Sequence, residues 1–267
     1  MSDTSGANPG ASYLDIVARA GMDGLLKGKP VYITSVGAGP WILERSRMLA
    51  FAVSLIAEQV GVREQESYDH LRGIGVTEKK LVLGADLALL TPDLMNFRTK
   101  PSGKLGLQFD VNAFKDVADN PQLPAIIEAL GAYAKSHAKD VVLLRNGKAK
   151  SEIAPAAPSA ELLSYTRLED YLPRLAGLRA LFTSHLHLAI TSYSQRIPTF
   201  SLFVREKTRR FYEQIGHRER AIDLRTATLA DFTHFISAAE TATWTDADEA
   251  TLQRLKRESR KLIEFVK

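Results

Sequence analysis

Two histidines and a lysine in the second half of the chain have the types and spacing of a site that handles a small anion. His185 and His187 follow a short apolar run at residues 180–183, and Lys207 follows a second short run at residues 198–203. Imidazole exchanges protons near neutral pH, and an ammonium group can neutralise a phosphate or a carboxylate. These side chains therefore indicate acid–base chemistry on an anionic substrate.

The elements around these residues should bring them to one edge of a sheet. Residues 180–183 and 198–203 are typical of buried strands, and residues 188–195 of a helix. The second strand leads into a basic turn that also carries Arg205. In this strand–helix–strand–helix order both polar clusters follow strand carboxyl ends, where open α/β sheets bind ligands. We therefore predict an α/β fold with its site at this edge.

A glycine-rich turn near the N-terminus is a second candidate. Gly37 and Gly39 follow a predicted strand at residues 30–36 and precede a predicted helix at residues 41–60. A strand, a glycine-rich turn and a helix can bind an anion through free backbone N–H groups. The glycines could instead only relieve the strain of a tight turn. The sequence leaves both interpretations open.

Arg63 and Asp86 are further candidates for ligand contacts. An arginine fork can bind a carboxylate or a phosphate through two parallel hydrogen bonds. Arg63 could equally pair with Glu64 or Glu66 at the surface. Asp86 follows a predicted strand at residues 79–83 and could either contact a ligand hydroxyl or cap a turn.

Four segments, taken in order, carry a resemblance to a known family. They are the Gly-Ala-Gly-Pro turn at residues 37–40, residues 62–67, residues 84–88, and the run at residues 183–190 with Ile197, Pro198 and Lys207 behind it. From about Gly28 to the C-terminus, the chain resembles the polysaccharide pyruvyl transferases. The resemblance implies two Rossmann-like lobes in a GT-B arrangement.

The resemblance also implies an activity and its substrates. Members of this family transfer the pyruvyl group of phosphoenolpyruvate to a pair of sugar hydroxyls, in the synthesis of exopolysaccharides and cell-surface glycans. No cofactor beyond this donor is expected. The acceptor would be a saccharide, either lipid-linked or nucleotide-linked.

The same resemblance assigns roles to individual residues. His187 would be the catalytic acid or base, and Arg63 and Lys207 would neutralise the charges of the donor. The remaining predicted substrate contacts are His185, Arg205, Gly37, Gly39 and Asp86. At His185 the chain departs from the family, which has an arginine there. Histidine lacks the permanent charge and the bidentate fork, so donor binding would be weaker or the acceptor different.

Two other functions compete with the transferase. His185 and His187, two positions apart, could share a face and bind a metal, although the sequence supplies no convincing third ligand. The chain could also be a non-catalytic family member that retains a sugar-binding or anion-binding site. Turnover of phosphoenolpyruvate with a sugar acceptor would distinguish the enzyme from the binding module.

The predicted organisation is a flexible tail at residues 1–11, a partial N-terminal lobe at residues 12–100 and a C-terminal lobe at residues 101–267. The last helix would pack back on the first lobe. The family's initial strand and glycine-rich turn have no counterpart before Tyr13, so we expect either a fragment or a shortened member with an incomplete first lobe. A small parallel sheet exposes an edge, which would favour homo-oligomers.

Composition excludes several classes of protein. The 267 residues include no cysteine, which excludes thiol catalysis, cysteine-ligated metals and disulfides and agrees with a cytoplasmic location. No apolar run approaches the roughly 18 residues that a membrane span needs. A net charge of +4 favours acidic ligands only mildly and does not indicate nucleic acid.

Overall fold

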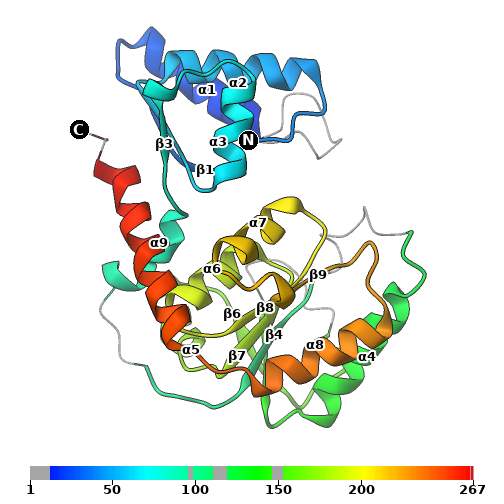
Figure 1. Cartoon of the computed structure of the whole chain (residues 1–267). Coiled ribbons are helices and arrows are strands. Elements are labelled where there is room, and N and C mark those ends of the chain that lie inside the picture. Colours follow the sequence, from blue (N-terminus) through cyan, green and yellow to red (C-terminus); the bar gives the residue numbers. More distant parts are fainter. Residues whose placement is uncertain (1–12, 96–98, 111–118, 146–152, 265, 267) are drawn as a thin grey trace. The chain divides into compact units, whose positions relative to one another are not determined.

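The computed structural model describes residues 13–95, 99–110, 119–145, 153–264 and 266. The chain forms two compact units (Figure 1). One unit comprises the chain up to Leu89 together with Gln253–Lys267, and the other comprises Leu90–Leu252. The division falls within the last helix, α9 (Asp246–Glu264), so that helix contributes to both units.

The first unit is built on a three-stranded parallel sheet in the order β1-β2-β3. Its elements are α1 (Tyr13–Leu26), β1 (Tyr32–Val36), α2 (Glu44–Ile56), β2 (Gln59–Val62), α3 (Gln65–Gly73), η1 (Glu78–Lys80) and β3 (Leu81–Leu83), followed by η2 (Leu87–Leu94). The predicted helix at residues 41–60 is wrong at its end, because Gln59–Val62 forms the central strand of this sheet.

Helices cover both faces of this small sheet. Ile33 of β1 lies in a buried cluster with Val53 of α2 and Leu71 of α3. Successive strand residues point to opposite faces, so Thr34 faces the other way. Its hydroxyl donates a 2.7 Å hydrogen bond to the carbonyl of Leu262 on α9. The unit therefore buries apolar residues although it has only three strands.

The second unit contains a six-stranded sheet in which every strand pairing is parallel. Its elements are β4 (Leu105–Gln108), α4 (Leu123–Ser136), β5 (Val141–Arg145), β6 (Glu161–Ser164), α5 (Leu168–Leu175), β7 (Ala180–Thr183), α6 (Leu186–Ser194), β8 (Thr199–Phe203), α7 (Glu206–Gln214), η4 (Arg218–Arg220), β9 (Ala221–Asp223) and α8 (Leu229–Thr241). These sheets confirm the predicted α/β fold with Rossmann-like lobes.

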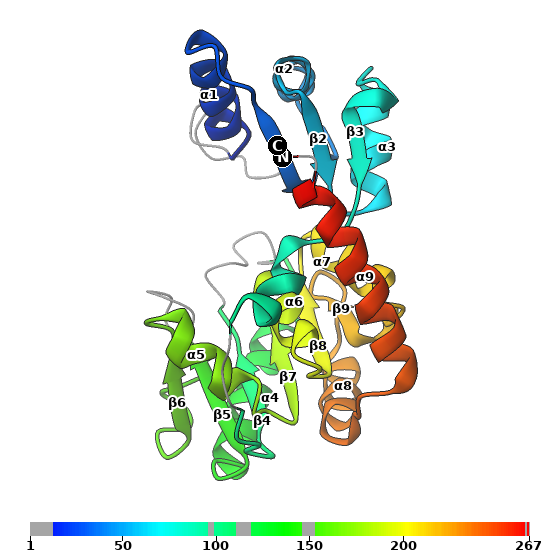
Figure 2. The same ribbon diagram turned by 90° about the vertical axis from the view of Figure 1, so that its left-hand side faces the viewer.

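The strand order β6-β5-β4-β7-β8-β9 changes direction once within the second unit. The chain runs outward from β4 to β6, returns to place β7 beside β4, and then runs outward in the other direction. Figure 2 shows these central strands side by side. The boundary between β4 and β7 is the topological switch point, where doubly wound sheets bind their ligands.

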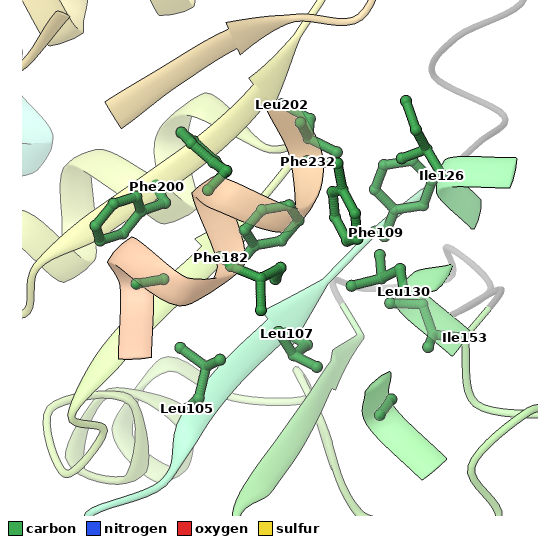
Figure 3. Close-up of a cluster of buried hydrophobic side chains, with 14 of the residues drawn as sticks. Leu105, Leu107, Phe109, Ile126, Leu130, Ile153, Phe182, Phe200, Leu202 and Phe232 are labelled. Carbon is green, nitrogen blue, oxygen red and sulfur yellow. The ribbon is translucent and has the colours of Figure 1, made fainter. Parts of the chain in front are cut away.

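Alternating apolar residues bury both faces of this sheet. On one face Phe182 and Leu107 pack with Phe232 of α8 and Leu130 of α4 (Figure 3). On the other face Leu181 packs with residues of α5 and α6. Strands covered on both sides form a platform that positions the residues at the strand ends.

No helix in the parts of the chain that the structure describes is long and apolar enough to cross a membrane.

Candidate functional site

Polar side chains connect the ends of β4 and β7 at the switch point. The side-chain oxygen of Gln108 accepts a 2.6 Å hydrogen bond from the Thr183 hydroxyl and a 3.1 Å bond from the Ser184 amide. The Ser184 hydroxyl accepts a 3.2 Å bond from the Asp110 amide. Gln108 and Thr183 are buried, and buried hydrogen bonds of this kind are costly to break. The network therefore holds the ends of β4 and β7 relative to each other.

An imidazole and a carboxylate face each other across this switch point. Nε2 of His185 lies 3.8 Å from Oδ2 of Asp110. His185 is the N-cap residue of α6, and its amide donates a 3.0 Å hydrogen bond to the Thr183 hydroxyl. Asp110 was not among the residues predicted from the sequence, where its only signal is an acidic residue two positions after the end of β4.

Burial sets the protonation state of His185. Desolvation lowers the pKa of this imidazole below its ordinary value, the Asp110 carboxylate opposes the shift, and the positive charges of Lys207 and Arg205 add to it. His185 is therefore mainly neutral at pH 7. The charges of Lys207 and Arg205 act on His185 because the loop after β8 lies near the loop after β7.

His187 and Lys207 occupy equivalent positions in neighbouring strand–helix units. Each is the second residue of its helix, since α6 begins at Leu186 and α7 begins at Glu206. The strands that precede these helices, β7 and β8, are paired and parallel, so both helices begin at the same edge of the sheet. His187 is exposed and Lys207 is partly buried. The convergence of their side chains on one ligand stays a prediction.

Two arginines, Arg205 and Arg209, lie at and just inside the start of α7, and acidic neighbours bind the second of them. Arg209 bonds Glu206 at 2.6 Å and Glu213 at 2.5 Å along α7. Arg205, the N-cap residue of α7, is exposed. Arg205 is therefore the better placed of the two to meet a ligand at this edge.

In the first unit, the ends of all three strands contribute to a charge cluster. Arg63, directly after β2, bonds Asp86 after β3 at 2.8 Å and its neighbour Glu64 at 3.2 Å. A Cβ on Gly37, after β1, would lie 2.9 Å from Nη2 of Arg63. Asp86 also accepts a 3.0 Å hydrogen bond from the Ala88 amide, so it caps its turn. The ion pairing that the sequence suggested for Arg63 thus exists, but in a largely buried setting.

The glycine-rich turn makes tight contacts with the rest of the first unit. The Ala38 amide donates a 2.7 Å hydrogen bond to the Ser67 hydroxyl. Gly39 has a positive φ of 65°, and a Cβ there would lie 2.5 Å from the His70 ring. Helix α2 begins only at Glu44. These contacts fit the tight-turn interpretation, and anion binding by Gly37 and Gly39 stays a prediction.

A metal site lacks support from the side-chain arrangement. Among the residues that the structure describes, no group of three or more His, Cys, Asp or Glu side chains could hold a metal ion. Asp110 is the carboxylate that approaches His185, and it supplies one potential ligand only.

The fold is similar to that of several solved sugar-nucleotide enzymes. UDP-GlcNAc 2-epimerase from Methanocaldococcus jannaschii is 11% identical with a TM-score of 0.58, over 94% of this chain and 74% of that chain. MnaA of S. aureus, solved with UDP, is 12% identical with a TM-score of 0.57, and the match covers 96% of this chain and 76% of that chain. UDP-GlcNAc 2-epimerase from Neisseria meningitidis, bound to UDP-GlcNAc, is 12% identical with a TM-score of 0.56, and the match covers 96% of this chain and 82% of that chain. At these identities the similarity establishes a GT-B-like fold alone.

The family itself is identified at the level of sequence. No protein of curated function matches the chain significantly. The family model of polysaccharide pyruvyl transferases matches residues 3–202, about three quarters of the length, and this region includes His185, His187 and Arg63. The chain therefore belongs to the polysaccharide pyruvyl transferase family.

Proposed function

We propose that this protein transfers the pyruvyl group of phosphoenolpyruvate to two hydroxyls of a saccharide, in the synthesis of a cell-surface glycan or exopolysaccharide. The observation that carries the proposal is that His185 follows β7 while Arg205 and Lys207 follow β8, and that these two strands are paired and parallel, in a chain of this family. Such an edge suits a donor that carries a phosphate and a carboxylate side by side.

The reaction defines what the site has to do. Two acceptor oxygens form bonds to the central carbon of the enolpyruvyl unit, and the bond from that carbon to the phosphate oxygen breaks. One hydroxyl proton ends on the methylene carbon, which becomes a methyl group. The other proton ends on the released phosphate. The site must therefore neutralise a multiply charged donor and move two protons.

The proposed roles follow from the position of each residue. Lys207 and Arg205, at the start of α7, would neutralise the phosphate and carboxylate of the donor. Backbone N–H groups at the starts of α6 and α7 would add to this attraction, because the N-terminal end of a helix favours negative charge. His187, exposed in the first turn of α6, would act as the acid or base.

The first unit would supply further substrate contacts. Arg63, Gly37, Gly39 and Asp86 are proposed to bind part of the donor or the acceptor, as the family resemblance suggests. A nucleotide-linked saccharide is our proposed acceptor, supported by a fold shared with proteins solved with UDP and UDP-GlcNAc. A lipid-linked saccharide is the alternative. We also propose that the protein is cytoplasmic, because nucleotide-linked and lipid-linked sugars are both made in the cytoplasm.

The proposal is tested by incubating the full chain with phosphoenolpyruvate and a panel of nucleotide-linked and lipid-linked saccharides. Mass spectrometry of the saccharides would detect a gained carboxyethylidene group, and this product is the expected result. A protein that binds phosphoenolpyruvate and the saccharide but forms no such product with any acceptor would instead be a binding module, which would overturn the proposal.

Replacing Lys207 should mainly weaken donor binding. A hydrogen bond to a charged group contributes about 1.5–3 kcal/mol, so Lys207→Ala should raise the KM for phosphoenolpyruvate at least about tenfold. The kcat should change less, because an ammonium group that stabilises the bound donor and the transition state equally affects KM and not kcat. Steady-state kinetics over a range of donor concentrations would measure both constants.

Lys135→Ala provides the matched control, since Lys135 is an exposed lysine of α4 in the same unit. This variant should behave like the wild type. An unaltered donor KM in Lys207→Ala would remove Lys207 from the site.

A further inference from the structure

His185 stands where the family resemblance implies an arginine, and unlike an arginine it can exchange a proton. Arginine stays charged at any accessible pH, so it can bind an anion but cannot act as a base. The imidazole at this position sits at the switch point, 3.8 Å from the Asp110 carboxylate. A histidine here loses the anion binding of an arginine but can act as a base, provided that its surroundings keep the imidazole neutral and oriented.

The proposed reaction contains two proton transfers from two different hydroxyls. The first hydroxyl oxygen bonds to the central carbon and gives up its proton, and the methylene carbon takes up a proton. The second hydroxyl oxygen bonds to the same carbon while the phosphate leaves, and its proton ends on the phosphate. One base can serve both steps only if it releases the first proton before it accepts the second. Two bases can each accept one proton.

We propose that His185, held by Asp110, is a second proton carrier of this site, accepting the proton of one acceptor hydroxyl while His187 serves the other. This role rests on the proposed function. It needs no oxidant, reductant or further reactant, since each proton removed from a hydroxyl is returned to the carbon or to the phosphate. Asp110 acts through His185 and is a positioning residue.

The charges that face His185 fit this role better than donor binding. Burial, Lys207 and Arg205 favour the neutral imidazole, and Asp110 favours the charged one. A neutral ring adds little attraction for phosphate, and the nearby carboxylate of Asp110 would repel the donor. The same carboxylate stabilises the imidazolium that forms when His185 takes a proton, as in carboxylate–histidine pairs generally. Lys207 and Arg205 then remain the groups that bind the donor.

The role of His185 is tested by a comparison of two variants with the wild type. His185→Gln should lower kcat about 100-fold while the KM for phosphoenolpyruvate stays within about twofold, the loss expected for one proton carrier. His185→Arg, which introduces the arginine that the family resemblance implies, should lower kcat to the same extent, and its added charge should at most lower the donor KM. A His185→Arg variant with wild-type or higher kcat would overturn the proposal, because it would show that His185 only binds the donor.

The role of Asp110 is tested first without turnover and then by the pH profile of kcat. NMR titration of the histidine side chains should give His185 a midpoint below its ordinary value, and Asp110→Asn should lower that midpoint further, because Asp110 raises the pKa of His185. The acidic limb of the kcat profile should shift to lower pH in the same variant, since a base works in its deprotonated form. An unchanged midpoint in Asp110→Asn would overturn the pairing. Circular dichroism would verify that the variant is folded.

These readouts separate the inference from the proposed function. If the wild type formed no product with any acceptor but the NMR midpoints still shifted, the pairing of His185 with Asp110 would stand and the transferase with its second proton carrier would be refuted. If the wild type formed product but the His185 variants kept the wild-type kcat, only the second proton carrier would be refuted.

Discussion

His187→Ala is expected to lower kcat about 100-fold to 10,000-fold while the protein stays folded, because proton transfer by a positioned side chain contributes about that much to a rate. The residue is exposed in the first turn of α6, so its side chain contributes little to the core. The KM for phosphoenolpyruvate should change much less, since Lys207 and Arg205 are the proposed donor-binding groups. Initial rates at saturating donor and acceptor would measure the loss.

His234→Ala is the matched control for this substitution. His234 is an exposed histidine of α8, in the same unit and also on a helix. Both variants should unfold at the wild-type urea concentration, and only His187→Ala should lose activity. Equal rates for the two variants would remove His187 from catalysis.

Arg63→Ala is expected to destabilise the protein by about 3 kcal/mol, the largest stability effect predicted for this chain. The guanidinium bonds Asp86 at 2.8 Å and Glu64 at 3.2 Å, and both carboxylate side chains are about nine-tenths buried. Removing Arg63 would leave two carboxylates in the interior without their cation. Chemical denaturation in urea would measure the loss in the free energy of unfolding.

Two companion variants make this prediction specific. Arg72→Ala removes a pair with Glu78 at 2.9 Å in the same unit, but both side chains there are more than half exposed, so stability should change by less than about 1 kcal/mol. Adding Asp86→Asn to Arg63→Ala should recover part of the lost stability, because it removes one of the two buried carboxylates that Arg63 no longer contacts. Equal stability of Arg63→Ala and Arg72→Ala would contradict a structural role for the buried cluster.

The stability measurement also clarifies the function of Arg63. Its fork is engaged by two carboxylates, so a substrate anion would have to share it or displace one of them. If Arg63 binds substrate, the Arg63→Ala, Asp86→Asn double variant should regain stability but not activity. A double variant that regains both would assign Arg63 to the fold alone.

The sequence predicted the parts of the fold that local patterns specify. The apolar runs at β7 and β8 and the polar residues after them were enough to place His185, Arg205 and Lys207 behind two strands, and the structure pairs these strands in parallel. The order and spacing of these segments also identified the family, which the family model confirms. Both successes rest on short-range patterns or on their order along the chain.

The sequence did not predict what depends on pairing between distant segments. β2 directly follows a helix and β6 lies in a polar segment, so neither showed a recognisable strand pattern in the sequence. Asp110 lies 75 positions before His185, and only the parallel pairing of β4 with β7 brings them together. The contact between Arg63 and Asp86 likewise depends on the pairing of β2 with β3.

The most direct test of pyruvyl transfer at the edge formed by the loops after β7 and β8 is phosphorus NMR of phosphoenolpyruvate incubated with the full chain and a saccharide acceptor. We predict release of inorganic phosphate by the wild type and by His234→Ala, dependent on the acceptor and matched by the ketal product, and almost none by His187→Ala. Release that is independent of the acceptor, or equal in wild type and His187→Ala, would contradict the account.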